Sequence, residues 1–390
     1  AIKIEPNYPD GAVVYVKDAS QSPFVMANLM NDKTKAEYIR KTKEEYETLR
    51  KTTMEKKIEL TPLVEARKNP YKIDWDNFEA FKPNFIGRKV LDPIKIEDIV
   101  PYINWKFFFP AWNLSAKFAS VKNISMCGHC KAQWFAAFNE GEREKAMEAS
   151  KLYDDAQVLL KKIIDLDAEY IKAVFVIGEA YSENDTVYID NVPFAMLRQQ
   201  KKSNKDHYLS LADFVTPKSA NKKDYLGAFA VTAGAGADYL MNKYKTSGDE
   251  YSALVLQSLL DRLAEGATEW LHEKIRKEYW GYDSSEELTI PEMFAVKYSG
   301  IRPAVGYPSI PDQSINFDLH NNLLQSDEIG ISLTENGLMS PNASVSGLIF
   351  AHPEAKYFAI GAISDEQAND YMQRRGMETE LSKKYLAANI

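Results

Sequence analysis

The stretch KAVFVIGEAYSENDTVYIDNV, residues 172–192, decides the fold class. Its two halves, KAVFVIGEAY and TVYIDNV, are rich in the β-branched and aromatic residues that strands favour, and the polar segment SEND separates them. This pattern predicts a β-hairpin. Because a hairpin joins antiparallel strands, the sequence favours an antiparallel sheet over the parallel sheet of a doubly wound protein.

Further segments predict strands of the same kind. DYLGAFAVTAG, residues 224–234, is an apolar run of strand length. ASVSGLIFAH, residues 343–352, and KYFAIGAI, residues 356–363, are separated by PEA and predict a second hairpin. We therefore expect a sheet that is built largely from hairpins.

Long helices are predicted between these strands. Residues 140–166 carry apolar side chains at helical spacing, and residues 249–281 form the longest periodic segment, with Gly281 placed to end the helix. SDEQANDYMQRRG, residues 364–376, begins with a capping box and ends on glycine. Hairpins with long helices between them indicate an α+β fold, an antiparallel sheet with long packed helices. The apolar face of the longest helix is expected to comprise Leu256, Leu260, Leu263, Ala267, Leu271 and Ile275.

The first 60 residues follow a different pattern, and we divide the chain into residues 1–60 and 61–390. AVVYVK, residues 12–17, predicts a strand that is followed by a helix. One such strand needs neighbours in a parallel sheet, so we expect the end of a domain whose remainder lies upstream. The chain also starts at Ala1 without an initiator methionine, as a fragment would. Residues 32–57 are charged and helix-forming, and they predict a linking helix.

Composition limits the classes of partner. The chain has 390 residues, of which 45% are hydrophobic, enough for a sizeable core. A net charge of −8 argues against attraction to nucleic acid or anionic lipid. The sequence contains no apolar run of membrane-spanning length and no signal-peptide pattern, so we expect a cytoplasmic protein that binds small molecules or proteins.

Motifs of catalytic and metal sites are weak in this sequence. CGHC, residues 127–130, could form a redox pair or half a zinc site, but it lacks a clear preceding strand and a second ligand pair. We favour an ordered loop with reduced cysteines. Glu269 and His272 form one E-x-x-H motif, which a di-iron site needs twice, so a solvated helix face is expected there. We predict no catalytic residue and no metal site.

The loop GIRPAVGYPSIPD, residues 300–312, is the strongest candidate for binding. Its prolines restrict the backbone, and Arg302 could bind a carboxylate through two parallel N–H bonds. Gly306 lacks a Cβ, so a ligand could approach the backbone there, and Tyr307 adds an aromatic face and a hydroxyl group. The alternative is a structural loop with a surface arginine.

Many separate stretches carry a resemblance to one family. They include YINWKFFFPAW (102–112), LADFVTPKS (211–219), DYLGAFAVT (224–232), GIRPAVGYPSIPD (300–312) and LTENGLMSPNASVSGLIF (333–350). With them the chain resembles the C-terminal part of cobalamin-dependent methionine synthases. Residues 61–390 are similar to the reactivation domain, which binds S-adenosylmethionine. Residues 1–60 are similar to the end of the preceding α/β cobalamin-binding domain, a strand-helix remnant with its linker helix.

The resemblance implies a repair function in a methyltransferase. The domain would bind S-adenosylmethionine and position its methyl group for the reductive methylation of cob(II)alamin, which a missing upstream domain binds. Flavodoxin or a similar protein would supply the electron. Two alternatives stay open: a docking platform with weakened or lost ligand binding, and a thiol redox role for Cys127 and Cys130.

The resemblance also assigns the ligand site. It implies that Arg302 holds the ligand carboxylate, while Asn104 stands where the family has an aspartate that meets the ligand amino group. The lost charge predicts weaker binding by about 1–2 kcal/mol. The segment Gln313–Asn316 lacks charges that the family often has, which puts the usual contacts with the cobalamin domain in doubt. The implied site comprises Arg302, Ala304, Gly306, Tyr307, Tyr357, Phe358, Asn104 and Glu265.

Overall fold

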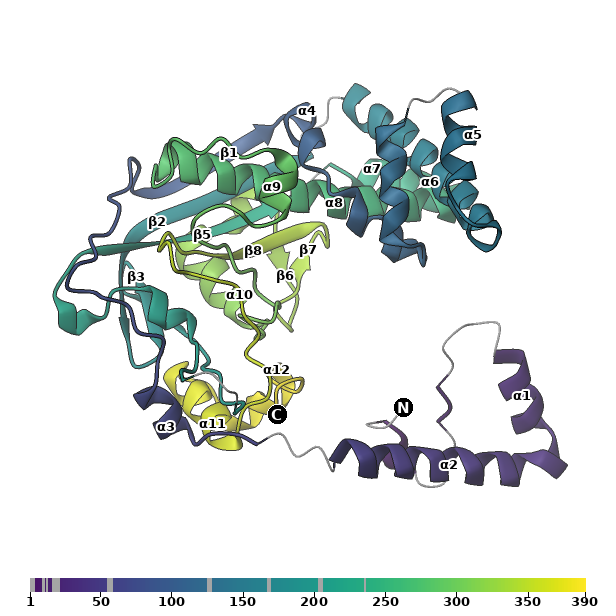
Figure 1. The fold of residues 1–390 in the computed structure, drawn as a ribbon, viewed down its shortest axis with the longest axis horizontal. Helices are drawn as coiled ribbons and strands as arrows, with labels where there is room; N and C mark the ends of the chain where they lie inside the picture. The colour runs from purple at the N-terminus through teal and green to yellow at the C-terminus, as the bar shows by residue number, and fades with distance from the viewer. Residues whose placement is uncertain are drawn as a thin grey trace. The chain divides into compact units, whose positions relative to one another are not determined.

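The computed structural model in Figure 1 describes most of the chain. The described residues are 4–8, 11, 13–15, 22–54, 59–124, 128–166, 170–202, 206–234 and 236–390. The chain divides into two compact units, Ala1–Leu60 and Thr61–Ile390. No helix among the described residues is long and apolar enough to cross a membrane.

The described residues of the first unit form a 3₁₀-helix (Glu5–Asn7) and two α-helices, α1 (Ser22–Met30) and α2 (Asp32–Met54). The helix predicted at residues 32–57 is confirmed as far as Met54, and residues 55–57 lie outside the described residues; its role as a linker stays a prediction. The prediction of a strand at 12–17 is wrong for residues 13–15, while residues 12, 16 and 17 lie outside the described part. The Tyr15 N–H donates to the Tyr46 hydroxyl of α2 at 2.9 Å, where a strand would bond to a neighbouring strand.

In the described part of the second unit, six strands form one antiparallel sheet. The predicted hairpin is confirmed: Glu183 pairs with Thr186, and Asn184 and Asp185 make the turn with φ angles of 48° and 58°. Asparagine and aspartate tolerate this left-handed conformation best among residues with a side chain. The order is β4-β3-β2-β5-β8, with β1 also paired to β2. The strands are β1 (Gly87–Ile94), β2 (Ile171–Glu183), β3 (Thr186–Ile189), β4 (Val192–Ala195), β5 (Asp224–Thr232) and β8 (Ser344–Ile349).

The prediction of a second hairpin is wrong. Its first arm is strand β8, but residues 356–363 form no strand. The open edge of β8 is taken by the proline loop instead: Ile301 pairs with Phe350, and Ala304 pairs with Gly347. The segment after the turn bonds to that loop, with Ile360 N donating to the Pro308 carbonyl at 2.9 Å. A separate two-stranded sheet joins β6 (Ser332–Leu333) and β7 (Met339–Ser340).

The central strands of the main sheet are buried on both faces, because helices and short helical turns cover each face. On β2, Phe175 packs in one core cluster and Val174 in another. The predicted α+β class, an antiparallel sheet with long packed helices, is confirmed (Figure 1). The α-helices of this unit are α3 (Leu63–Lys68), α4 (Ile96–Ile99), α5 (Gly128–Ala136), α6 (Glu140–Asp165), α7 (Asp238–Thr246), α8 (Glu250–Lys274), α9 (Ile290–Phe294), α10 (Ile315–Asp318), α11 (Asp365–Arg374) and α12 (Ser382–Tyr385).

Helix α8 connects the helical part of this unit with the sheet (Figure 1). Asp249 caps its first turn by accepting a hydrogen bond from Ser252 N at 3.0 Å. The predicted apolar face is confirmed, since its six members are all buried. Its last turn widens into a π-turn at Ile275–Tyr279, and the chain then leaves the helix at Gly281, whose φ is +82°.

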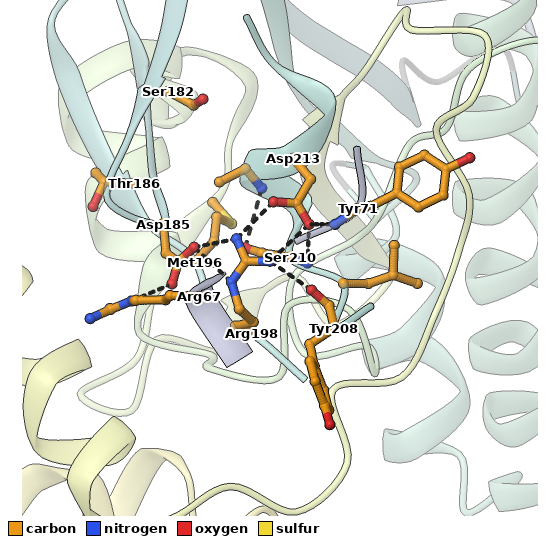
Figure 2. Close-up of polar contacts among 12 residues, drawn as sticks. Arg67, Tyr71, Ser182, Asp185, Thr186, Met196, Arg198, Tyr208, Ser210 and Asp213 are labelled. Atoms are coloured by element: carbon orange, nitrogen blue, oxygen red, sulfur yellow. Dashed lines mark hydrogen bonds and ion pairs between the residues drawn. The ribbon is translucent and has the colours of Figure 1, made fainter. Parts of the chain in front are cut away.

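A largely buried charged cluster fastens helix α11 to the sheet; we call Arg67, Asp185, Arg198, Asp213 and Asp370 the Arg198 cluster. Figure 2 shows the Arg198 guanidinium between the carboxylates of Asp185 and Asp213, and these ion pairs measure 2.5 and 2.7 Å. Arg67 of α3 extends the cluster to Asp185 and to Asp370 of α11, at 2.8 and 2.6 Å. The cluster therefore joins the β2–β3 turn, α3 and α11.

Buried histidines predict how stability depends on pH. His352 packs between Trp75 and Phe78, its Nδ1 accepts a hydrogen bond from Glu354 N at 3.1 Å, and burial lowers its pKa to about 4. Below the unfolded pKa of about 6.5, the unfolded chain binds a proton that the folded chain does not bind. We expect this residue to remove about 1.4 kcal/mol of stability for each pH unit between pH 6.5 and 4.

Urea unfolding at pH 7.5, 6 and 5 tests this expectation. In His352→Asn the amide oxygen can still accept from Glu354 N, but the titrating group is gone, so its free energy of unfolding should fall less steeply with acidification than that of the parent chain. Equal slopes for the two proteins would contradict the prediction.

Candidate ligand-binding site

A cavity of about 820 Å³ lies in the second unit, beside the proline loop. Pockets for small molecules commonly span about 300–1,000 Å³, so this one has the size for a nucleoside-linked amino acid. Its walls come from α8, the turn around Asn104, residues 293–298, the loop 302–309 and residues 357–359. Most lining side chains are apolar or aromatic, and a few charged groups are gathered on α8 and the loop.

The proline loop is held along the edge of strand β8. Val305 N donates to the Ser346 carbonyl at 2.9 Å, and Leu348 N donates to the Pro303 carbonyl at 3.1 Å. A Cβ on Gly347 would lie 2.3 Å from the Pro303 oxygen, so the close approach of loop and strand requires glycine there. The sheet thus fixes the backbone that carries Arg302 and Ala304 into the cavity wall.

Arg302 forms an ion pair with Glu269 of α8 at the cavity wall. Its backbone N–H donates to the Tyr357 hydroxyl at 2.9 Å. Burial opposes the charge of the guanidinium, but the Glu269 carboxylate holds the pKa of Arg302 above its ordinary value. Within the described part of the chain, Arg302 Nε and Glu269 Oε1 are buried without a hydrogen-bond partner. The pair therefore keeps unused hydrogen-bonding capacity.

The expectation of a solvated helix face at Glu269 and His272 is wrong. Glu269 is 7% exposed and His272 is 1% exposed, because the loop and residues 282–298 cover this side of α8. The ring of His272 packs edge-on against Tyr298, and its Nε2 lies 3.3 Å from the Tyr282 hydroxyl. Burial, with Arg276 and Arg302 nearby, lowers the pKa of His272 well below its ordinary value, so this imidazole is neutral at pH 7.

Tyr307 and Glu265 meet at the rim of the cavity. The Tyr307 hydroxyl donates to Glu265 Oε1 at 3.0 Å. The negative charge of Glu265, with burial, raises the pKa of Tyr307 to about 12. The tyrosine therefore stays protonated at neutral pH and remains a hydrogen-bond donor.

Asn104 lines the same cavity from the turn that precedes a short 3₁₀-helix (Trp105–Phe107). Its side-chain oxygen accepts a hydrogen bond from Lys106 N at 3.2 Å, which caps that helix. The residue is uncharged, so it brings no counter-charge for a ligand cation. An aspartate could make the same cap.

The structure brings seven of the eight sequence-predicted residues to one cavity and places Gly306 beside it. Gly306 lines an adjoining hollow of about 410 Å³, has a φ of +85°, and would carry a Cβ 2.5 Å from Gln313 Oε1. Glycine is needed there for the turn and for the contact with Gln313. The seven residues are Asn104, Glu265, Arg302, Ala304, Tyr307, Tyr357 and Phe358.

The segment Gln313–Asn316 bears on the expected docking contacts. Ser314 and Asn316 are fully buried. The Ser314 hydroxyl donates to Asp312 Oδ1 at 2.6 Å, and the Asn316 amide donates to the Gly337 carbonyl at 2.8 Å. Both side chains face the interior of this unit, so neither can meet a partner domain directly.

Residue Glu269 is the main functional candidate that sequence reasoning missed. It lies one helical turn after Glu265, and residues four apart share one face of a helix. Glu265 was assigned to the site from the resemblance, so this spacing was the signal that could have added Glu269. The cavity is also lined by Tyr102 and Phe107, from the stretch YINWKFFFPAW, and by Arg262, Val296 and Tyr298, none of which was predicted as a site residue.

The described residues of the CGHC segment, 128–130, are not among those that line this cavity. Cys130 belongs to helix α5, so the expected loop is wrong at that residue, and Cys127 lies outside the described residues. Within the described residues there is no group of three or more His, Cys, Asp or Glu side chains that could hold a metal ion.

Comparisons with known proteins match both the sequence and the fold of this chain. The family model described as "Vitamin B12 dependent methionine synthase, activation domain" matches residues 95–376, a range that contains all eight predicted site residues. The chain is also similar to a solved structure, the crystal structure of the MetH reactivation domain bound to AdoHcy (S-adenosylhomocysteine). The two are 33% identical with a TM-score of 0.75, and the match covers 85% of this chain and 98% of that chain.

Proposed function

The chain belongs to the activation-domain family of vitamin B12 dependent methionine synthases, and from that premise we propose that its cavity binds S-adenosylmethionine and positions the sulfonium methyl for transfer to cobalt. The resemblance found in the sequence is thereby confirmed at the level of the family, which is a family of methyltransferase domains. The ligand, the methyl transfer and the partners are the content of the proposal.

One observation carries the proposal: the Arg302–Glu269 ion pair in the wall of a largely apolar cavity. A buried charged pair with unused hydrogen-bonding atoms is suited to the charged end of an amino acid, and the apolar walls are suited to an adenosine group. The solved structure to which the chain is similar is described as bound to S-adenosylhomocysteine, the product that remains when S-adenosylmethionine loses its methyl group.

The residues of this chain would act by binding and orientation. Arg302 would hold the ligand carboxylate, and the hydrogen bond from its backbone to Tyr357 fixes the loop. The Glu265 carboxylate at the cavity rim can attract the positive charge of a sulfonium, whereas a neutral thioether gains no such attraction. Cobalamin presented by its own domain would supply the nucleophile for the methyl group, with one electron supplied from outside and S-adenosylhomocysteine as the leaving group. The chain needs no acid, base or nucleophile of its own.

The proposal includes partners and a place in the cell. The methyl acceptor would arrive on a cobalamin-binding domain, and flavodoxin or a similar protein would donate the electron in the cytoplasm. We also propose that residues 1–60, with α1 and α2, are the end of that domain and its linker. On this reading residues 61–390 alone should bind S-adenosylhomocysteine as well as the full chain does; a lower affinity of the shorter chain would contradict the division.

Calorimetric titration separates this function from the docking-platform alternative. The alternative is favoured by one observation, that Arg302 already has an internal partner. Binding of S-adenosylmethionine and S-adenosylhomocysteine, each with a rise in melting temperature, is the expected result. Absence of heat and of a thermal shift at millimolar ligand would instead support the platform.

A gain of affinity is expected for Asn104→Asp. The aspartate can keep the cap on Lys106 N and adds a negative charge to the cavity, where it can meet the ligand ammonium. A hydrogen bond to a charged group is stronger by about 1–2 kcal/mol, so affinity for S-adenosylhomocysteine should rise about 5–30-fold. The control is Asn77→Asp, an exposed asparagine outside the cavity, which should leave affinity unchanged. An unchanged or lower affinity in Asn104→Asp would contradict the prediction.

A further inference from the structure

Glu269 holds a charge that its surroundings only partly satisfy. The residue is 93% buried near the C-terminal end of α8, where a carboxylate loses most of its hydration. One oxygen, Oε2, accepts from Arg302 Nη2, and among the described residues the other, Oε1, has no hydrogen-bond partner. A buried carboxylate with an idle oxygen is costly unless a further donor reaches it.

The cationic side chains near Glu269 do not bind its Oε1 atom, so a ligand could. Arg276 lies about two helical turns after Glu269, in the π-turn that ends the helix, and Glu286 binds it through two contacts of 2.6 Å. His272 is neutral, and its ring nitrogen Nε2 faces Tyr282. Arg302 is thus the cation that neutralises Glu269, and the pair has no net charge.

Arg302, like Glu269, has polar atoms that the ion pair does not use. It uses one terminal nitrogen for Glu269, and its Nε is buried without a partner in the described part of the chain. A guanidinium has five N–H donors, so it can bind a second carboxylate beside the first. The pair therefore has one acceptor and several donors to offer to the same ligand.

We propose that Glu269 is the residue that receives the ligand's ammonium group, so that Arg302 and Glu269 together recognise an amino-acid zwitterion. This inference rests on the proposed function and deepens it. The zwitterionic end brings one negative and one positive charge to a pair of opposite charges, so each charge meets its complement. Asn104 lines the same cavity but is uncharged, and its oxygen is occupied by the cap on Lys106.

The proposal makes Glu269 a determinant of specificity. An analogue with a carboxylate but no ammonium group would bring a second negative charge next to Glu269. An analogue with an ammonium group but no carboxylate would form no ion pair with Arg302. Both should bind worse than the complete amino acid. A nucleoside that lacks the whole amino-acid end should be indifferent to Glu269.

The experiment compares two ligands on the full chain by calorimetric titration. S-adenosylhomocysteine has the amino-acid end, whereas 5′-methylthioadenosine has the same adenosine and thioether without it. In Glu269→Gln we expect affinity for S-adenosylhomocysteine to fall about 10–100-fold, while affinity for 5′-methylthioadenosine stays unchanged. The matched control is Glu278→Gln, an exposed residue just past α8 that lies outside the cavity and should leave both affinities unchanged.

Binding of 5′-methylthioadenosine also shows whether a variant keeps a folded cavity. If Glu269→Gln disturbs the cavity and binds neither ligand, Glu269→Asp replaces it, since aspartate keeps the charge on a shorter side chain. Its affinity for S-adenosylhomocysteine should fall less than that of any neutral replacement that still binds 5′-methylthioadenosine, such as Glu269→Ala.

The outcomes are distinct. A parent chain that binds neither ligand overturns the proposed function. A parent chain that binds S-adenosylhomocysteine, with equal or tighter binding in Glu269→Gln, overturns only the role of Glu269, because the carboxylate would then be a spectator or a competitor for Arg302.

Discussion

Arg302→Ala abolishes measurable binding of S-adenosylhomocysteine, with affinity reduced at least about 100-fold, if the ligand carboxylate lies where we propose. Two charge-assisted hydrogen bonds contribute about 1.5–3 kcal/mol each, and 1.4 kcal/mol corresponds to a tenfold change in affinity. Nothing else on the loop can replace them, because Ala304 and Pro303 carry no charge. Calorimetric titration of the variant and the parent chain measures the loss.

The internal partner of Arg302 requires a control for stability. Removal of the arginine leaves Glu269 buried without its counter-charge, which is expected to destabilise this unit by about 3–5 kcal/mol. The double variant Arg302→Ala/Glu269→Gln has no such orphaned charge, so it should regain stability but not binding. Arg88→Ala, which removes an arginine paired with Glu328 outside the cavity, should keep full affinity. A double variant that is stable and binds within a few-fold of the parent chain would refute the assignment of Arg302.

Arg198→Met is expected to cost about 3–5 kcal/mol of folding free energy. Methionine has similar length, but it leaves two buried carboxylates, Asp185 and Asp213, without the cation between them (Figure 2). Arg67 still reaches Asp185, but Asp213 has no second cation among its contacts in the described residues. The Tyr208 carbonyl loses its donor at 2.6 Å as well.

Urea unfolding followed by tryptophan fluorescence measures this loss. The matched control is Lys223→Met, which removes an exposed cation paired with Glu179 at 2.9 Å and should change stability by less than about 1 kcal/mol. Because the cluster joins α3 and α11 to the β2–β3 turn, Arg198→Met should also make helix α11 more accessible to proteases. A variant as stable as the control would show that the cluster carries no net stabilising energy.

Local sequence patterns predicted the elements that are decided by their own residues. The hairpin at 172–192 follows from strand-forming residues around two residues that tolerate positive φ. Helix α8 follows from its apolar spacing and from Gly281, which supplies the conformation that ends it. In both segments the neighbours in sequence are also the partners in space.

The predictions that were wrong concern residues whose structure depends on segments far away in the chain. The segment 356–363 has strand-forming residues, but the edge of β8 that it would need is bonded to residues 301–305. The chemical character of Glu269 depends in the same way on Arg302, 33 residues later. On a helix in isolation that glutamate would face water, and only the packed loop makes it buried and paired.

The candidate site was predicted from the resemblance more than from physical reasoning on single residues. The proline loop and Arg302 could be argued from chemistry, because arginine on a stiff loop suits a carboxylate. Asn104 and Tyr357 lie about 200 residues before and 55 residues after that arginine, and no local pattern marks them. Their convergence on one cavity is a property of the packed sheet and of α8.

The seating of the proline loop on β8 has a consequence for solubility. A bare edge strand offers a row of free N–H and C=O groups that can recruit strands from other molecules, and residues 301–305 occupy those groups on this edge. Changes that unfasten the loop, at Gly347 for example, would therefore promote self-association of the protein as well as loss of the cavity. A ligand that holds the loop on β8 would therefore reduce self-association through this edge.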